Sequence, residues 1–455
     1  MGGAARACGK QAAMAKVDLQ PPRGTRDFYP EDMRVRNWLF EQFRQIAHLY
    51  AFEEVDAPIV EHAELFIRKA GEEIVDQLYH FTLHDRHLAL RSEMTPSIAR
   101  MVMARAGGLR LPLRWFAITQ NWRYERTTRG RRREHYQWNM DIWGEPEVGA
   151  EAELLSAITL ALERLGLGPA DVQIRVNSRA LLEETLREGV LRNRPEAFEA
   201  LCVAIDKLSK IGPQAVLELL CNPEGAVRLT KAEAQGVVEL LGAKNLDQAA
   251  QRAPRGSRAL EELRRLFQEL DAYGCRNWVV FDASVVRGLA YYTGIVFEAF
   301  DTRGTLRSIC GGGRYDRLLE SMGGNAIPAV GFGFGDAVIL ELLADRGLLP
   351  ARPRDLDGVV FGFGEAERAA AIRLAGRLRR AGHSIELVLG HVKLRRVLQD
   401  ADRAGAERVY LIGPDEAARG EVKVRNLRTG EERTLPFAEV PAEGDRAMRR
   451  GQDEL

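Results

Sequence analysis

The chain has 455 residues, enough for two or three domains of roughly 100–200 residues each. It carries 65 basic and 65 acidic side chains, so net charge indicates no nucleic-acid partner, and any RNA-binding surface must come from local clusters. No run approaches the roughly 18 apolar residues of a membrane span, and the five scattered cysteines argue against zinc or disulfides and for a reducing compartment.

Residues 1–17 form a leader that we exclude from the fold. Up to Lys16 it has basic side chains among alanines and glycines, and no acid. Two interpretations stay open. The leader is a short or truncated transit segment, which would place the protein inside a chloroplast or mitochondrion. Otherwise it is a disordered leader of a cytoplasmic protein, with Met14 as an alternative start.

Residues 18–177 are predicted to hold both helices and strands. Apolar residues recur at helical spacing from Glu31 to Tyr50 and predict a long amphipathic helix, which a strand over 52–56 follows. A hairpin is predicted over residues 80–92. Later in the region we expect a helix over 147–165 and a strand over 172–176.

Glu93 and Thr95 are candidate ligand groups between the hairpin and the next predicted helix. Pro96 stands early in that helix, where its missing N–H does little harm. The plain alternative is that the two side chains only cap the helix.

The stretch 113–144 is predicted to form two strands, each with one apolar and one polar face. The polar faces carry Asn121, Arg123 and Glu125 on the first strand and Gln137, Asn139 and Asp141 on the second. The connecting loop has five arginines around Gly130, which repel one another unless an anion is near. We interpret the pair as a pocket for a polyanion and a small zwitterion. The alternative is a solvated basic ribbon.

Residues 178–262 are almost entirely helical in pattern and carry no cluster typical of a site, so they are predicted to be an inserted helical domain. The sheet resumes at 279–282, and an aromatic strand follows over 285–300. Arg287 stands just before the aromatic residues of that strand. A buried arginine needs an anionic partner, and the alternative to a ligand is a structural ion pair.

Two glycine-rich stretches complete this part of the chain. Residues 310–317 (CGGGRYDR) predict a turn beside a strand, and 331–343 (GFGFGDAVILELL) predict a small-residue strand that runs into a helix. Glycines in a strand allow a ligand to approach the backbone closely.

Beyond a Pro/Arg linker at 349–356, strands and helices alternate. Strands are predicted at 358–363, 384–389 and 408–412, helices at 365–381 and 392–404, and a hairpin near 421–436. This order predicts an α/β domain over 356–440. Lys393, Arg395 and Arg396 open one helix and can contact RNA phosphate or simply form a solvated face. Residues 441–455 form a polar tail.

Several of these stretches resemble the histidyl-tRNA synthetases, a family of class II aminoacyl-tRNA synthetases. WRYER at 122–126, GRRRE at 130–134 and YQWNMD at 136–141 resemble motif 2, and RGLAYYTG at 287–294 resembles the histidine-specific signature. The resemblance implies an α+β class II catalytic core over 18–177 and 263–347. That core has an antiparallel sheet flanked by helices, with the helical insertion and a C-terminal α/β anticodon-binding domain. It also implies a homodimer.

The resemblance also implies roles for individual residues. Arg123 would hold the ATP α-phosphate and the amino-acid carboxylate, and Arg287 would stabilise charge during transfer. The histidine-binding residues would be Glu93, Thr95, Gln137, Asp141, Tyr291 and Tyr292. The ATP-binding residues would be Arg123, Arg131, Arg133, Gly333 and Gly335.

One departure concerns motif 3. Class II enzymes usually carry an arginine near the start of its helix, where it clamps the γ-phosphate of ATP, and Val338 stands there in this chain. We expect a motif 2 arginine, Arg131 or Arg133, to do that work. Mg²⁺ would accompany ATP, without protein ligands that the sequence identifies.

The implied activity is that of a histidine–tRNA ligase, which uses histidine, ATP and tRNA(His). The first alternative is a histidine-binding regulatory subunit of ATP phosphoribosyltransferase without ligase activity, although such a paralogue lacks the C-terminal domain. The second is a class II synthetase for another amino acid, against which the stretch 287–294 argues.

Overall fold

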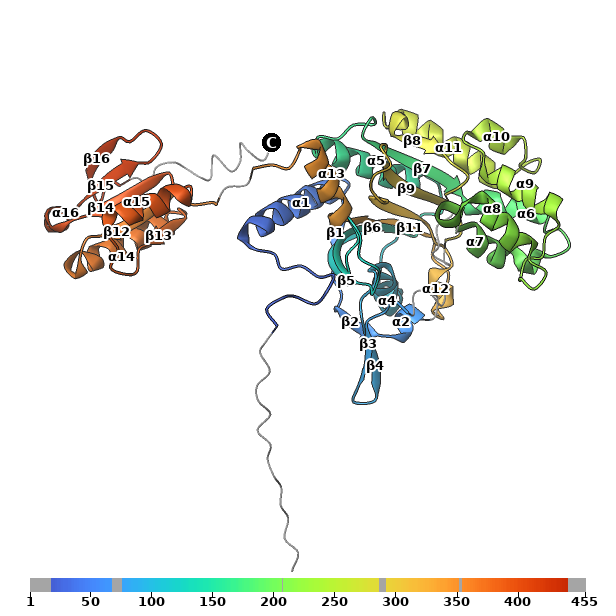
Figure 1. Cartoon of the computed structure of the whole chain (residues 1–455), viewed down its shortest axis with the longest axis horizontal. Coiled ribbons are helices and arrows are strands. Elements are labelled where there is room, and N and C mark those ends of the chain that lie inside the picture. The colour runs from blue at the N-terminus through green and yellow to red at the C-terminus, as the bar shows by residue number, and fades with distance from the viewer. Residues whose placement is uncertain (1–17, 68–75, 207, 286–291, 352–353, 441–455) are drawn as a thin grey trace, which may run out of the picture. The chain divides into compact units, whose positions relative to one another are not determined.

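The computed structural model describes residues 18–67, 76–206, 208–285, 292–351 and 354–440. Contacts within the chain divide it into two compact units, Met1–Leu349 and Pro350–Leu455 (Figure 1). Each unit has its own sheet and its own hydrophobic core. Within the described residues, no helix is both long enough and apolar enough to cross a membrane.

The first unit is built on an eight-stranded sheet among its described residues. In spatial order its strands are β1 (Glu53–Glu54), β5 (Leu113–Trp122), β6 (Glu134–Trp143), β11 (Ala329–Gly335), β10 (Cys310–Arg314), β9 (Ile295–Asp301), β7 (Val172–Ser178) and β8 (Val279–Phe281). The outermost pairs at the two edges, β1 with β5 and β7 with β8, are parallel. The pairings between them are antiparallel, so the predicted antiparallel sheet is confirmed.

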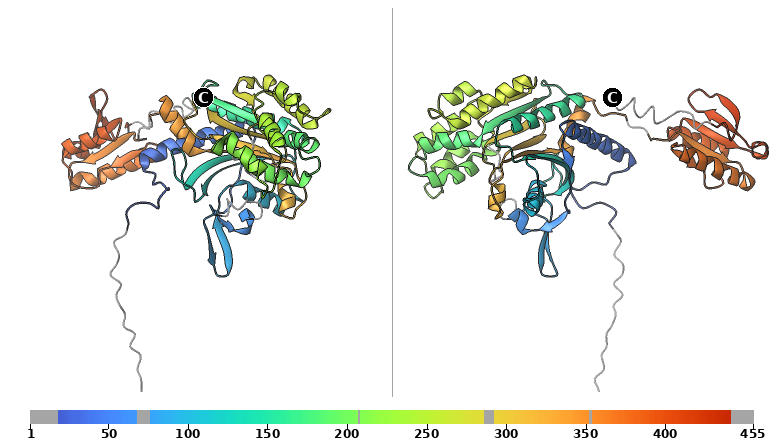
Figure 2. Two further views of the ribbon diagram at one scale, coloured as in Figure 1. Left: turned by 45° about the vertical axis from the view of Figure 1, so that its right-hand side comes forward. Right: turned by 180° about the vertical axis from the view of Figure 1, so that it is seen from behind.

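Helices α1 (Pro30–Leu49), α5 (Gly149–Arg164) and α11 (Arg258–Ala272) pack against one face of this sheet and share its main core (Figure 2). Phe43 of α1 stacks on Trp138 of β6, with ring centroids 4.7 Å apart, and Phe334 of β11 contacts Phe43 edge-on. Trp138 and Met140 are fully buried, which confirms the apolar face predicted for β6. The opposite face of β6 is therefore left for its polar side chains.

A three-stranded sheet lies beside the large one, in the order β2 (Val60–His62), β4 (Arg86–Leu90), β3 (His80–Leu83). Strands β3 and β4 form the predicted hairpin, and His84 and Asp85 make its turn with positive φ. Helix α4 (Thr95–Arg105) follows the hairpin and begins at the predicted position. The short helices α2 (Glu64–Ile67) and α12 (Leu318–Ser321) both contact α4.

Between β7 and β8 the chain is helical, as the pattern of 178–262 indicates. The helices are α6 (Arg179–Glu188), α7 (Phe198–Asp206), α8 (Leu208–Cys221), α9 (Lys231–Leu241), α10 (Leu246–Ala250) and α11, with α8 kinked at Gly212. A separate core, which includes Leu201, Val216 and Val237, holds α6 to α9 together. Residues of α10 and α11 belong to the main core instead.

The second unit is a five-stranded sheet with helices against it. Its strands run in the order β13 (Ile385–Leu387), β12 (Gly358–Gly362), β14 (Arg408–Ile412), β15 (Glu421–Asn426), β16 (Glu432–Pro436). The first three strands are parallel and the last two form an antiparallel hairpin. Helices α14 (Glu365–Arg380) and α15 (Leu394–Arg403) agree with the predicted α/β order, whereas α16 (Pro414–Arg419) was not predicted.

A buried ion pair fixes the end of β10 to α5. Arg314 Nε and Nη2 each donate to one carboxylate oxygen of Glu151 at 2.6 Å, and Nη2 also donates to the carbonyl oxygen of Glu147 at 3.1 Å. Glu151 is 1% exposed and Arg314 is 7% exposed. The pair therefore sets the position of Tyr315, the next residue in the chain.

Replacing Arg314 by Ala should lower the free energy of unfolding of the first unit by about 3–5 kcal/mol, because Glu151 would stay buried without a counter-ion. Urea unfolding followed by tryptophan fluorescence measures this, since all six tryptophans precede residue 350. Arg258→Ala is the control, because it breaks an exposed helical pair with Glu262 and should cost about 0–1 kcal/mol. Equal losses for the two variants would contradict this role of the buried pair.

Candidate functional site

The polar face of β6 lies beside a run of glycines in β11. In the antiparallel register, Gly331 is opposite Asp141 and Gly335 is opposite Gln137. A Cβ atom at Gly331 would lie less than 3.0 Å from the Asp141 carboxylate, and one at Gly333 would lie less than 3.0 Å from the Gln137 amide. Only glycine leaves room for these side chains above the neighbouring strand. The two glycine-rich and polar motifs of the sequence thus form one surface.

Asp141 is completely buried at one end of this surface. Its Oδ1 accepts a hydrogen bond from the Tyr315 hydroxyl, and its Oδ2 has no hydrogen-bond partner. Burial raises the pKa of Asp141 to about 7, against the lowering effect of the Tyr315 hydrogen bond. A buried acceptor of this kind fits a ligand that brings its own N–H group. Tyr315 lies in the 310–317 stretch but was not identified as a site residue from the sequence.

Arg123 follows β5 directly and is held against the segment that precedes α4. Its Nε donates to the carbonyl oxygen of Ser92 at 3.0 Å, and its Nη2 lies 3.8 Å from Glu93 Oε2. Thr95, the first residue of α4, is buried. The predicted residues Glu93, Thr95 and Arg123 therefore occupy neighbouring positions, although they come from separate parts of the sequence.

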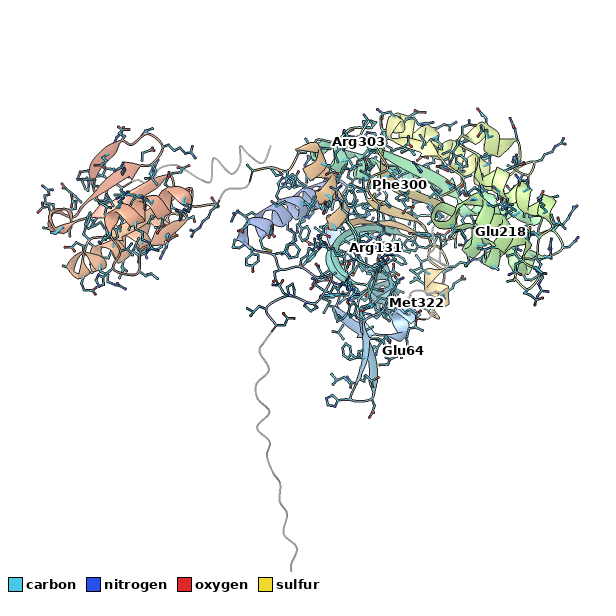
Figure 3. All side chains as sticks on the ribbon, in the orientation of Figure 1. Glu64, Arg131, Glu218, Phe300, Arg303 and Met322 are labelled. Atoms are coloured by element: carbon cyan, nitrogen blue, oxygen red, sulfur yellow. The ribbon has the colours of Figure 1, made fainter. Side chains whose placement is uncertain are left out.

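The arginines between β5 and β6 have different surroundings (Figure 3 labels Arg131). Arg131 Nε donates to the Glu125 carboxylate, within the loop itself. Arg129 pairs with Glu341 and Asp345 of α13 (Asp336–Arg346), which fastens the loop to that helix. Two of the five loop arginines are thus paired with carboxylates.

Arg133 does not line the pocket that Arg131 and Arg132 line. Its guanidinium lies 3.7 Å from the centroid of the Tyr124 ring and donates to the carbonyl oxygens of Arg23 and Glu125. The structure therefore does not bring this predicted ATP-binding residue together with the rest.

The pocket lies between the loop, the glycine strand β11 and the start of α13. Its lining residues are Arg123, Glu125, Gly130, Arg131, Arg132, His135, Gln137, Glu298, Arg307, Ser308, Ile309, Cys310, Gly311, Gly333, Gly335, Ala337 and Val338. The predicted residues Arg123, Arg131, Gln137, Gly333 and Gly335 are among them.

Three further charged or titratable lining residues were not predicted: His135, Glu298 and Arg307. Burial and the guanidinium of Arg123 lower the pKa of His135 to about 3, so its imidazole is neutral at neutral pH. The sequence marks His135 and Arg307 only by their positions. His135 lies between the two halves of the motif 2 stretch, and Arg307 lies just before the glycine-rich residues 310–317.

Arg287 and Tyr291 lie outside the described residues. Tyr292 is buried, and its ring centroid lies 6.4 Å from that of Tyr315, whose hydroxyl donates to Asp141. Within the described part of the chain, no group of three or more His, Cys, Asp or Glu side chains could hold a metal ion.

Family profiles and individual relatives of the chain indicate the same family. A family profile for histidyl-tRNA synthetase matches residues 24–336, and one for an anticodon binding domain matches residues 358–443. The chain is 48% identical over 428 residues to "Histidine--tRNA ligase, chloroplastic/mitochondrial" of Arabidopsis thaliana, covering 93% of this chain and 86% of that protein. It is 40% identical over 425 residues to a histidine–tRNA ligase of Opitutus terrae, covering 92% and 96%.

Solved structures share the fold. The histidyl-tRNA synthetase of a Nostoc species superposes with a TM-score of 0.74 at 23% identity, covering 96% of this chain and all of that one. A Bacillus halodurans protein titled an ATP phosphoribosyltransferase regulatory subunit/histidyl-tRNA synthetase superposes with a TM-score of 0.72 at 22% identity, covering 88% and 99%.

The raised pKa of Asp141 predicts a pH-dependent stability difference. Between about pH 4 and pH 7 the unfolded chain releases this proton and the folded chain keeps it, so wild type loses stability as pH rises. Asp141→Asn removes the titration, and its stability relative to wild type should rise across this range by up to about 4 kcal/mol. Urea unfolding at several pH values measures the difference, with exposed Asp32→Asn as the control. A pH-independent difference for Asp141→Asn would contradict the raised pKa.

Proposed function

The chain belongs to the histidyl-tRNA synthetase family and is an ATP-dependent ligase, and we propose that the pocket beside β6 and β11 is where it activates histidine. The observation that carries this proposal is the polar face of β6 against the glycines of β11: Gln137 lines the pocket with Arg123 and Arg131, and Asp141, four residues further along β6, is a buried acceptor outside that pocket. Such a surface is complementary to a triphosphate at one end and to an imidazole at the other.

In the first step, a carboxylate oxygen of histidine attacks the α-phosphorus of ATP. A new P–O bond forms as the bond to the bridging oxygen breaks, and pyrophosphate leaves. This reaction needs alignment of the two substrates and neutralisation of charge, without a protein nucleophile. We assign Arg123 to the α-phosphate and the histidine carboxylate, which its position in the pocket supports. Arg287 is assigned to the developing charge by family resemblance.

At the other end, we assign the imidazole of histidine to Asp141. The vacant hydrogen-bonding capacity of Asp141 Oδ2 supports this, because an imidazole N–H would satisfy a buried oxygen that otherwise costs about 1–3 kcal/mol. Tyr292 and Tyr291 would border the ring. Glu93, with Thr95 and Gln137, would hold the α-ammonium group of the amino acid.

ATP would lie against β11, where Gly333 and Gly335 let the nucleotide approach the backbone. We propose that Mg²⁺ arrives as part of the MgATP substrate, since this ion keeps several waters and binds mainly to phosphate oxygens. Glu125 and Glu298 are the carboxylates that line the pocket.

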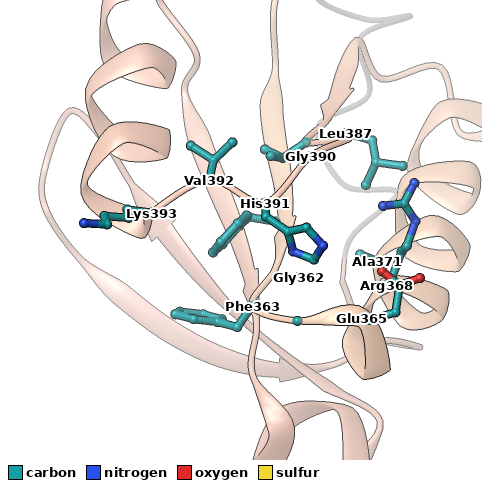
Figure 4. Close-up of a pocket in the computed structure, with 13 residues that line it drawn as sticks. Gly362, Phe363, Glu365, Arg368, Ala371, Leu387, Gly390, His391, Val392 and Lys393 are labelled. Carbon is teal, nitrogen blue, oxygen red and sulfur yellow. The ribbon is translucent and has the colours of Figure 1, made fainter.

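In the second step, a ribose hydroxyl at the 3′ end of tRNA(His) attacks the carbonyl carbon of the adenylate, and AMP leaves. We propose that the second unit binds the anticodon. Support comes from its family match and from a pocket at the carboxyl ends of its parallel strands, in which His391 lies between Phe363 and Arg368 (Figure 4). An exposed aromatic ring beside cationic side chains suits an unpaired base and its phosphate.

Two further proposals follow, one from the family resemblance and one from a relative. We propose a homodimer, and light scattering that gives the 50.9 kDa mass of one chain would contradict it. We propose an organellar location, supported by the chloroplastic/mitochondrial name of the Arabidopsis thaliana relative, and imaging of a tagged chain would test it. The regulatory-subunit alternative is not favoured, because the curated relatives are ligases and the anticodon-binding profile matches.

Histidine-dependent exchange between ATP and pyrophosphate tests the activation step. We expect exchange with histidine and none with other amino acids, and Arg287→Ala should lower its rate at least about a hundredfold if this residue stabilises developing charge. A wild-type chain without histidine-dependent exchange would refute the proposed function. Undiminished exchange by Arg287→Ala would remove only that residue from the mechanism.

Phe363→Ala should raise the KM for tRNA in aminoacylation by roughly 5- to 100-fold, the range of one lost base–aromatic stack, while pyrophosphate exchange stays unchanged. Exchange does not involve tRNA, so unchanged exchange shows that the first unit of the variant is intact. Ile372→Ala is a matched control, because Ile372 is also 49% exposed but does not line the pocket. Equal effects of the two variants would show that the pocket is not the tRNA site.

A further inference from the structure

The pocket of the first unit has an excess of positive charge. Four arginines line it, Arg123, Arg131, Arg132 and Arg307, together with two glutamates, and its histidine is neutral. Two positive charges are therefore left without a counter-charge among the lining residues. Cations held this close together repel one another and favour a bound anion.

The pocket arginines differ in their partners. Arg123 is held by Glu93 and the carbonyl oxygen of Ser92, and Arg131 is held by Glu125. Arg307 has neither a hydrogen bond nor an ion pair with any described residue, although its charge interacts with Arg131 and Glu125. Arg132 also lines the pocket and has neither a hydrogen bond nor an ion pair with a described residue.

Arg307 stands on an ordered loop between β9 and β10. On one side of it, the Thr305 N–H and hydroxyl both donate to the Asp301 carboxylate, and Leu306 is buried. On the other side, Ile309 donates its N–H to Ala299 at 2.8 Å and accepts from the N–H of Gly335 at 3.2 Å. The backbone is thus fixed on both sides of a charged side chain that has nothing to bind.

Val338, in the first turn of α13, lines the same pocket and offers no charge. It packs against the loop glycine, since a Cβ at Gly130 would lie 3.1 Å from Val338 Cγ2. The helix that borders the pocket therefore contributes an apolar contact to the loop, and any cation at this end has to come from another element.

We propose that Arg307 binds the terminal phosphates of ATP and so supplies the cation that α13 lacks at Val338. This inference rests on the proposed function, because it names the residue that holds the part of ATP that leaves as pyrophosphate. The sequence led us to expect Arg131 or Arg133 in this role. Arg133 lies outside the pocket, and Arg131 lines it but is paired with Glu125.

The electrostatic state of Arg307 agrees with an anion at this position. Its pKa is lower than the ordinary value, because part of its side chain is shielded from water and because Arg131 repels its charge. A phosphate oxygen between these two guanidinium groups would turn the repulsion into two attractions.

The test compares ATP and AMP binding to the full chain by calorimetry, together with ATP–pyrophosphate exchange. Arg307→Ala should weaken ATP binding and raise the KM for ATP by about tenfold or more, since a charge-assisted bond to phosphate is lost. Affinity for AMP, which lacks the terminal phosphates, and the KM for histidine should stay unchanged. Arg307→Lys, which keeps the charge, should recover part of the ATP affinity.

Arg303→Ala is the matched control, because Arg303 is an exposed arginine of the same loop that does not line the pocket and lies apart from Arg131 (Figure 3). It should leave both nucleotide affinities unchanged. If Arg307→Ala does not fold, Arg307→Gln carries the same expectation.

Two results would overturn the inference: ATP binding that is unaffected by loss of the Arg307 charge, or an equal loss of ATP and AMP binding. A wild-type chain that binds ATP through Arg307 but shows no histidine-dependent exchange would refute the proposed function and leave the phosphate contact standing.

Discussion

The antiparallel register of β6 with β11 is the constraint on which the first unit depends. It sets glycines beside Gln137 and Asp141, and it places Trp138 and Met140 on the opposite face, in the core. A slip of one residue would exchange the two faces, because side chains alternate along a strand. It would bury the carboxylate and amide groups against α1 and expose a tryptophan. The packing of the core therefore also specifies the position of the polar groups.

The arginines of the loop between β5 and β6 are held by different kinds of partner. Arg129 is matched by two carboxylates of α13, Arg131 by Glu125, and Arg133 by an aromatic ring and backbone carbonyls. Each of these partners orders the loop as well as reducing repulsion. Arg307 lies on an equally ordered loop and lines the pocket without a hydrogen bond or ion pair to a described residue, which is the arrangement expected of a side chain kept for a ligand.

The division into two units separates the two kinds of chemistry that the proposed function requires. The first unit holds the pocket that we assign to amino-acid activation, and the second holds the pocket that we assign to the anticodon. A reaction that omits tRNA therefore reports on the first unit alone, and aminoacylation reports on both. The first unit has a large buried core and a buried ion pair between Arg314 and Glu151.

The sequence by itself determined the local structure and the family. Alternation assigned both faces of β6, turn residues located the hairpin at 80–92, and helix and strand periodicities gave most of the second unit, because these patterns depend only on neighbours along the chain. Motifs supplied Arg123, Gln137 and the β11 glycines as lining residues of one pocket. The tertiary structure alone decided that Arg133 turns away, that Tyr315 contacts Asp141 and that Arg307 enters the pocket. These outcomes depend on the pairing of distant strands and on the paths of loops, which no local pattern encodes.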